Sequence, residues 1–304
     1  MKKFILFTVC LFLSFTAYSQ ITSAQNGNWS DASTWVGGSI PGASDAVVIA
    51  HDVSCASTQS AATLTVNASK TLTVSVIGKL TVAGAVSNSG TILVVSEQFG
   101  SGSLIATSAS TFTLSYDLYI PATQWKLVGI PVSGVTIGDI DDNLATNTVG
   151  GVSKVGVGYY DSESAAWSVY AASSTGTLLA QTKGYEMIHS SGDVVRFSGS
   201  LRTGSRSTIA TYTNKWTLLG NPYPSYLRLS DDASGASGSN YFLNTTHLSY
   251  LKNTHQALYG WDGSAYDTYS NDSGSLDLLM PGDAFFVYGT SEETFSFTES
   301  MQVH

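Results

Sequence analysis

Short runs of alternating apolar and polar residues dominate the first third of the chain. Four such segments follow one another, the first three starting eight residues apart: T-L-T-V at 63–66, T-L-T-V at 71–74, K-L-T-V at 79–82 and T-I-L-V-V at 91–95. A period of two places Leu64 and Val66 on one face of a strand and Thr63 and Thr65 on the other. Short strands that repeat in this way bury their apolar faces by coiling into a solenoid. The pattern predicts a β-solenoid over residues 20–111.

The rest of the chain carries a longer pattern that occurs twice. W-K-L-V-G-I-P-V-S at 125–133 and W-T-L-L-G-N-P-Y-P-S-Y at 216–226 share Trp, Leu, an aliphatic residue, Gly and Pro at the same spacing. Gly permits unusual backbone angles and Pro removes a ladder donor, so each segment predicts a strand that ends at Gly-x-Pro. Similar segments follow each occurrence: Tyr159–Asp161 with Tyr259–Asp262, Lys183–Ile188 with Pro281–Phe286, and Val195–Leu201 with Phe295–Met301. A duplicated β module is therefore predicted, with copies at 112–212 and 213–304.

Composition agrees with an all-β chain. Charged residues make up only 12% of the sequence, while it contains 29 Gly and 16 Tyr. Long helices favour Ala, Leu, Glu, Lys and Arg, whereas Val, Thr, Tyr, Phe and Trp favour strands. We expect an all-β fold, with a short parallel β-solenoid followed by two related β-sandwich-like copies. One short helix is expected within 242–258, a flexible loop at 231–240, and a hairpin with a two-residue turn at 261–264.

The first 19 residues form a predicted signal peptide. Lys2 and Lys3 precede a mostly apolar run at 4–15, and Ala17–Ser19 gives a small-residue cleavage pattern. The chain has 13 basic and 22 acidic residues, and without these two lysines 11 basic residues remain against 22, a net charge of −11. Such a charge disfavours nucleic acids and anionic membrane surfaces as partners. We expect a secreted or cell-surface protein that is not inserted in a membrane after signal removal.

Two stretches carry a resemblance to known families. The segment W-S-D-A-S-T-W-V-G-G-S-I-P-G-A-S-D-A-V-V-I-A-H-D-V at 29–53 resembles the start of the eight-glycine domain and of β-helical segments in secreted bacterial surface proteins. The segments W-T-L-L-G-N-P-Y-P-S, G-W-D-G-S-A-Y and M-P-G-D-A-F-F-V resemble the duplicated β module of adhesin-like cargo of the type IX secretion system. The resemblance implies an exported, adhesin-like surface protein. Such cargo ends in a sorting domain, which residues 301–304 do not supply, so the chain is either a fragment or uses another export route.

Catalytic motifs are scarce. Polysaccharide lyases and hydrolases need clustered or paired carboxylates, but the acidic residues from 20 to 117 are scattered: Asp31, Asp45, Asp52, Glu97 and Asp117. Residues 139–143, D-I-D-D-N, alternate oxygen ligands like a calcium loop, but lack its turn Gly and closing Glu, which favours a solvated acidic loop. Cys55 is expected to be a small core residue, and His247 and His255 to serve a helix face or loop. We predict no catalytic residues, no metal site and no cofactor.

Aromatic residues point instead to binding. The candidate binding residues are concentrated in the second copy: Tyr223, Tyr226, Trp261, Asp262 and Tyr266. Aromatic faces beside acceptors suit sugars, although Tyr and Trp also build core and loop walls. Trp29 and Trp35 are interpreted as a plug at the open end of the solenoid, with a sugar platform as the alternative.

The sequence predicts a secreted, non-enzymatic, adhesin-like structural protein. The alternative is a carbohydrate-binding accessory module of a longer polysaccharide-degrading protein. The expected partner is an extracellular polysaccharide or another surface protein. The Thr-x-Thr ladders at 63–65 and 71–73 leave a third hypothesis, an ordered water layer like that of ice-binding solenoids.

Overall fold

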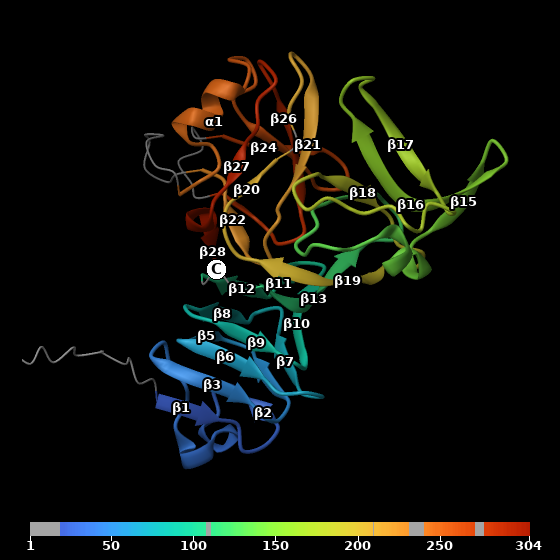
Figure 1. Cartoon of the computed structure of the whole chain (residues 1–304). Coiled ribbons are helices and arrows are strands. Elements are labelled where there is room, and N and C mark those ends of the chain that lie inside the picture. Colours follow the sequence, from blue (N-terminus) through green and yellow to red (C-terminus); the bar gives the residue numbers. More distant parts are fainter. Residues whose placement is uncertain (1–18, 108–110, 209, 231–239, 271–276) are drawn as a thin grey trace, which may run out of the picture.

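The computed structural model describes residues 19–304 except 108–110, 209, 231–239 and 271–276. The predicted signal peptide, apart from Ser19, and nearly all of the predicted loop at 231–240 lie outside the described residues. The fold is all-β, with 49% strand and 8% helix, as the composition predicts. Figure 1 shows a solenoid at one end and a broader body above it, with the last strand returning to the junction.

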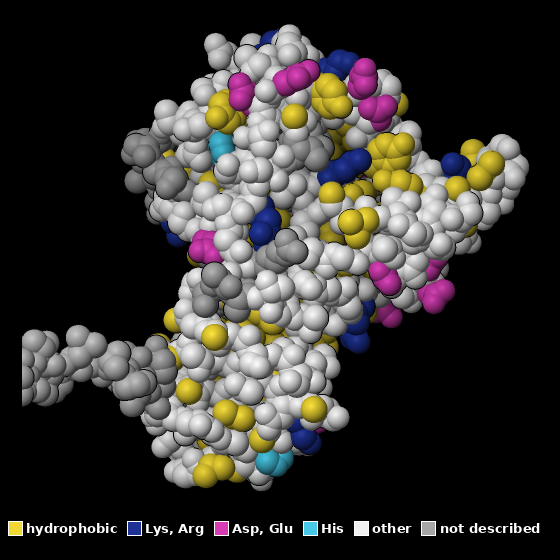
Figure 2. Space-filling model, viewed as in Figure 1, with side chains coloured by type: hydrophobic (Ala, Val, Ile, Leu, Met, Phe, Trp, Pro, Cys, Tyr) yellow, Lys and Arg dark blue, Asp and Glu magenta, His cyan; other side chains and the backbone are white. Residues whose placement is uncertain are grey.

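The solenoid has about four turns and three parallel sheets. The first sheet contains β1 (Ser19–Thr22), β3 (Asp45–Ile49), β6 (Thr63–Val66) and β9 (Val86–Asn88). The second contains β2 (Gly27–Asn28), β4 (Val53–Cys55), β7 (Thr71–Val74) and β10 (Thr91–Glu97). The third contains β5 (Thr58–Ala61), β8 (Lys79–Val82) and β12 (Ser103–Ala106). On the face shown in Figure 2, this lobe carries few charged side chains.

The three segments that repeat every eight residues form the three sides of one solenoid turn. The three repeated segments are β6, β7 and β8, which lie on three different sheets and not on successive levels of one sheet. Within a sheet, Leu72 pairs in parallel with Ile92, one full turn further along the chain. The predicted alternation is confirmed, because Leu64 and Val66 are buried while Thr63 and Thr65 are only partly covered.

Two tryptophans close the first turn of the solenoid. Trp29 and Trp35 are 0% and 2% exposed, and their rings meet edge to face with centroids 5.2 Å apart. Trp35 Nε1 donates to the Trp29 carbonyl oxygen over 2.7 Å. Trp29 precedes a short 3-10 turn, η1 (Ala32–Thr34), and Trp35 separates it from a second, η2 (Val36–Gly38). Because both rings are inside the core, they act as a plug and cannot offer a face to a sugar.

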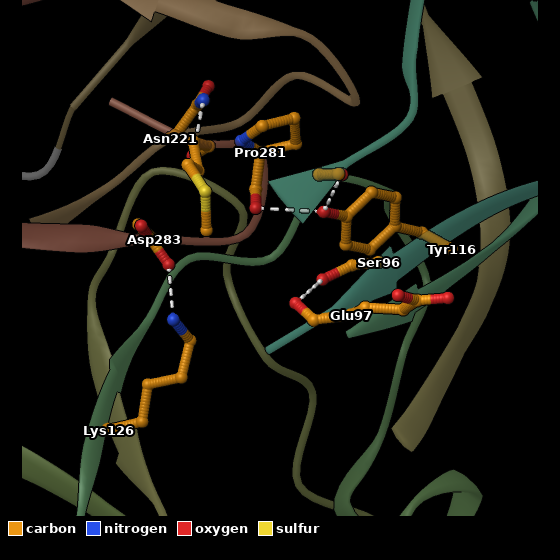
Figure 3. A network of polar contacts seen from close by, with 9 residues as sticks. Ser96, Glu97, Tyr116, Lys126, Asn221, Pro281 and Asp283 are labelled. Atoms are coloured by element: carbon orange, nitrogen blue, oxygen red, sulfur yellow. Dashed lines mark hydrogen bonds and ion pairs between the residues drawn. The ribbon is translucent and has the colours of Figure 1, made fainter. Parts of the chain in front are cut away.

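The other end of the solenoid continues into the upper body. β13 (Thr111–Ile120) lies parallel to β10 and pairs along its whole length with the antiparallel β19 (Asp193–Arg202), while β11 (Gly100–Ser101) pairs with β10. Tyr116 on β13 is fully buried, and its hydroxyl donates to the Pro281 carbonyl oxygen over 2.8 Å (Figure 3). The same hydroxyl lies 2.7 Å from Ser101 Oγ. Tyr116 thus joins the solenoid to a segment more than 160 residues away.

Two larger sheets form the upper body. One contains β14 (Lys126–Val128), β18 (Tyr185–Met187), β16 (Val152–Asp161), β15 (Thr146–Val149) and β17 (Ala166–Ala171). The other contains β21 (Trp216–Gly220), β26 (Ala284–Tyr288), β23 (Leu258–Trp261) and β24 (Tyr266–Tyr269). Shorter pairs and turns complete it: β20 (Arg206–Ser207), β27 (Ser296–Phe297), β22 (Tyr226–Arg228), β25 (Leu278–Leu279), β28 (Gln302–Val303), η3 (Ile137–Asp139), η4 (Asp141–Asn143) and η5 (Glu299–Met301).

One local prediction is confirmed and another needs correction. The short helix expected within 242–258 is α1 (Thr245–Tyr250), which ends because Leu251 returns to extended backbone and forms a bridge with Gly289. The predicted hairpin joins β23 to β24, but its loop spans residues 262–265 and has four residues, not two. Asp262 Oδ1 accepts from the backbone nitrogens of Ser264 and Ala265, and these bonds stabilise the wider loop.

The two upper sheets meet at the glycines of the repeated motif. A Cβ on Gly220 would lie 2.7 Å from Gly129 Cα and 2.9 Å from the Lys183 carbonyl oxygen. The motif predicts an unusual backbone angle at these glycines, and that prediction is wrong, because neither Gly129 nor Gly220 has a positive φ. Glycine is required because two backbones come too close for a side chain. An ion pair of 2.6 Å between Lys126 Nζ and Asp283 Oδ1 also links the two sheets (Figure 3).

Candidate functional site

Two adjoining cavities lie where the upper sheets meet. We call them the Phe286 pocket, with a volume of about 400 Å³, and the Glu186 pocket, with about 380 Å³, after the residue that distinguishes each. Trp167 and Tyr266 line both, so the two pockets form one continuous surface, the aromatic groove. Figure 2 shows hydrophobic side chains gathered on this part of the molecule, between β21 and β17.

The Phe286 pocket is built around a single ring. Phe286 on β26 is 5% exposed, and its ring centroid lies 5.0 Å from Tyr160 and 5.9 Å from Trp167, both on the β16–β17 hairpin. Trp216 on β21 lies 6.3 Å from Phe286, and Tyr266 on β24 lies 6.1 Å away. All four contacts are edge to face, which is the arrangement that aromatic quadrupoles favour. These contacts fix the walls of the pocket.

The Glu186 pocket has similar walls but contains a carboxyl group. Glu186 on β18 pairs with Leu127 on β14, as Phe286 on β26 pairs with Leu218 on β21. The remaining large walls are aromatic: Trp125, Trp167, Trp261 and Tyr266. Of the described residues that line this pocket, Glu186 alone is charged.

Burial dominates the electrostatics of Glu186. It raises the pKa of the carboxyl group from 4.5 to about 7. Among the described residues, no side chain or backbone group forms a hydrogen bond or ion pair with this carboxyl. Gly158 makes room for it, since a Cβ there would lie 2.7 Å from Glu186 Cγ. The pKa of Tyr266 is raised by its own burial and, to a lesser degree, by the charge of Glu186.

Two hairpins present the exposed rings of the groove. Trp167 is 37% exposed and pairs with Tyr160 across β16 and β17, while Tyr266 is 52% exposed and pairs with Trp261 across β23 and β24. Ring centroids within these pairs are 5.4 and 5.0 Å apart. Each hairpin ends in an Asp whose carboxylate accepts from backbone nitrogens of its own loop, Asp161 in one and Asp262 in the other. The Ser164 hydroxyl, followed by the Glu163 nitrogen, lowers the pKa of the Asp161 carboxyl, and the nitrogens of Ala265 and Ser264 lower that of Asp262, so both stay ionised in a structural role.

The predicted binding residues occupy three separate places. Trp261 and Tyr266 lie together in the groove, with Asp262 at the tip of their hairpin. Tyr223 is 1% exposed, and its hydroxyl donates to the Phe297 carbonyl oxygen over 2.9 Å, so it belongs to the core. Tyr226 lies at the junction with the solenoid, where its hydroxyl is 3.3 Å from the Ser101 carbonyl oxygen.

The aromatic and acidic groove residues outside the sequence-based choice are Trp125, Tyr160, Trp167, Glu186, Trp216, Tyr259 and Phe286. All except Trp167 belong to segments that mark the internal repeat. The repeat is therefore the signal that could have found them, because strands with the same pattern can place their aromatic residues where two similar sheets meet.

Other candidate sites have structural roles. Cys55 is fully buried, and burial raises the pKa of its thiol to about 11. In the acidic loop, Asp139 accepts from Thr136 N and Oγ1 at 2.8 and 2.7 Å, which caps η3. His247 is 4% exposed, lies 2.7 Å from the Phe242 carbonyl oxygen, and accepts from Ser296 N. Within the part of the chain that the structure describes, no three His, Cys, Asp or Glu residues are grouped to hold a metal ion.

Comparison with protein families gives one match. A family model described as a domain of unknown function, DUF8693, matches residues 20–304. The chain belongs to this family. No curated protein and no solved structure matches the sequence. None of the helices in the described residues has the length and apolar character needed to cross a bilayer. The match covers both the solenoid and the groove.

Proposed function

We propose that this DUF8693 protein is an exported, non-enzymatic, adhesin-like surface protein whose aromatic groove binds an extracellular polysaccharide. In this proposal the two upper sheets are copies of one β-sandwich-like module. The solenoid holds them away from the cell surface to which the protein is attached. The exposed rings of Trp167 and Tyr266 in the groove carry the proposal, because flat apolar faces with nearby polar groups suit sugar rings.

Strand order supports the duplication. The order β14-β18-β16-β17 in one sheet corresponds to β21-β26-β23-β24 in the other, and all of these pairs are antiparallel. The backbone hydrogen bonds between the two sheets are also reciprocal. Gly129 N donates to Gly282 O over 2.9 Å, while Gly220 N donates to Thr182 O over 3.1 Å. Such reciprocal contacts are expected where two similar units meet about a two-fold axis.

The composition of the groove supports a binding role without catalysis. Most glycoside hydrolases use a pair of carboxyl groups that flank the scissile bond. Among the described residues that line the two pockets, Glu186 alone bears a carboxyl group. With a single carboxyl group, the groove is suited to holding a sugar chain and leaving it intact.

An array of extracellular polysaccharides, probed with the full chain, tests the proposal. Trp167→Ala and Tyr266→Ala each remove an exposed ring and should weaken binding at least about tenfold. Tyr212→Ala is the matched control, because Tyr212 has the same 37% exposure as Trp167 but does not line the groove. Binding that is equal in all variants would contradict the groove as the site. A blank array with retention of the protein at the cell surface would leave only the structural role.

A further inference from the structure

The two pockets of the aromatic groove differ at one position that strand pairing matches, in a register two residues away from the sequence correspondence of 183–188 with 281–286. Phe286 and Glu186 each face a leucine of the neighbouring strand, Leu218 and Leu127 respectively. In the first pocket the Phe286 ring contacts four other rings and closes the junction. In the second, a carboxyl group takes that place among aromatic walls. The polarity of the groove therefore changes from one end to the other.

The carboxyl group of Glu186 has no partner among the described residues. A half-buried carboxylate is costly unless it is paired or hydrogen-bonded, and Glu186 has neither kind of partner there. Its side chain occupies space that a Cβ at position 158 would fill. Because it lines an open pocket, the carboxyl is accessible to a partner from outside the chain.

The surroundings define the chemistry of that partner. Aromatic faces attract cations through their quadrupoles, and a carboxylate adds a charge-assisted hydrogen bond to a protonated amine. A neutral sugar can donate hydroxyl hydrogen bonds to the carboxylate but leaves its charge uncompensated, and an anionic ligand would be repelled. The whole chain has a net charge of −9, which favours approach of a positively charged polymer.

We propose that the Glu186 pocket receives the protonated amino group of an amino sugar, so that the groove binds a polysaccharide with free amines. This inference rests on the proposed glycan-binding function and names its ligand class. The sugar rings stack on Trp167 and Tyr266, and the ammonium group lies against Glu186 between Trp125 and Trp261.

Calorimetric titration of the full chain tests this assignment. The probes are a glucosamine hexamer, an N-acetylglucosamine hexamer, a cellulose hexamer and a lysine hexapeptide. We expect the glucosamine hexamer to bind about tenfold more tightly than either neutral oligomer. Glu186→Gln should lower the affinity for the glucosamine hexamer to that of the neutral oligomers. Glu292→Gln, at an exposed glutamate outside the groove, removes the same charge and should leave the preference for the glucosamine hexamer in place.

Each alternative result has a distinct meaning. Equal affinity for amine and neutral oligomers, with both lost in Trp167→Ala, would overturn the amine assignment and leave glycan binding in place. A preference for amines that survives Glu186→Gln would also overturn it, because the acidic surface as a whole would then be responsible. Glu186-dependent binding of the lysine peptide without any glycan would identify a protein partner and overturn both proposals. Absence of binding by all four probes would overturn the amine assignment as well.

Discussion

Replacing Gly220 with alanine tests the contact that creates the groove. Gly220 ends β21, and the added Cβ would lie 2.7 Å from Gly129 Cα and 2.9 Å from the Lys183 carbonyl oxygen. Both neighbours are backbone atoms, so no rotamer change relieves the overlap and the strands must separate. Overpacking of this kind costs about 2 to 3 kcal/mol of unfolding free energy.

The separation of the strands should also affect binding. Gly220 N donates to Thr182 O and Gly184 N donates to Leu218 O, so both bonds would lengthen as β21 moves away. The loss can be measured by urea unfolding followed through tryptophan fluorescence, with glycan binding measured on the same samples. Gly176→Ala is the control, because no atom lies within 4 Å of its added Cβ and its φ is not positive, so its effect should stay within about 0.5 kcal/mol. Equal stability of both variants would refute the close backbone approach.

Three further substitutions give separate tests. Because the pKa of Glu186 is higher in the folded protein, the free energy of unfolding should fall as pH rises from 4.5 to about 7, by about 1 to 2 kcal/mol after allowance for partial exposure. Urea titrations at both pH values should show that Glu186→Gln lacks this decline; an equal decline would contradict the pKa assignment. Tyr116→Phe leaves the Pro281 carbonyl without its donor and should cost about 1 to 2 kcal/mol in the same assay, whereas no loss would show that the bond does not hold the junction. Phe286→Ala should cost about 3 to 4 kcal/mol by emptying the centre of four ring contacts, and a loss below about 1 kcal/mol would show that the pocket collapses around the gap.

The alternation of apolar and polar residues was sufficient to predict the solenoid, because every second residue of a solenoid strand faces the core. Leu72 and Val74 are completely buried in the way that the pattern requires, and Trp29 plugs the end of the solenoid as expected. The number of sides per turn could not be predicted. Equal eight-residue spacing fits successive levels of one sheet as well as three sides of a single turn, and only the parallel pairing of β7 with β10 distinguishes them.

The site was predicted less completely, since residue type does not reveal which face of a strand meets a partner. Tyr223 and Tyr266 look alike in the sequence, yet Tyr223 bonds to the backbone of the core and Tyr266 is 52% exposed. The sequence alone does not identify Glu186 as a binding residue, because a single acidic residue in a strand forms no recognisable motif. Its position becomes informative only when the pairing of β14 with β18 is compared with that of β21 with β26.

The two ends of the groove differ in polarity, because matched strand positions carry Phe286 at one end and Glu186 at the other. If the two sheets descend from one module, as proposed, identical residues at these positions would create two equal pockets, and a sugar chain could bind either way round. The phenyl ring instead makes one end apolar, while the carboxyl group makes the other acidic. If the groove binds an amino-sugar chain as proposed, the chain must place its ammonium group at Glu186, because the reverse orientation would leave the charge of that carboxylate uncompensated. Charge at one position would then determine the orientation of the bound chain.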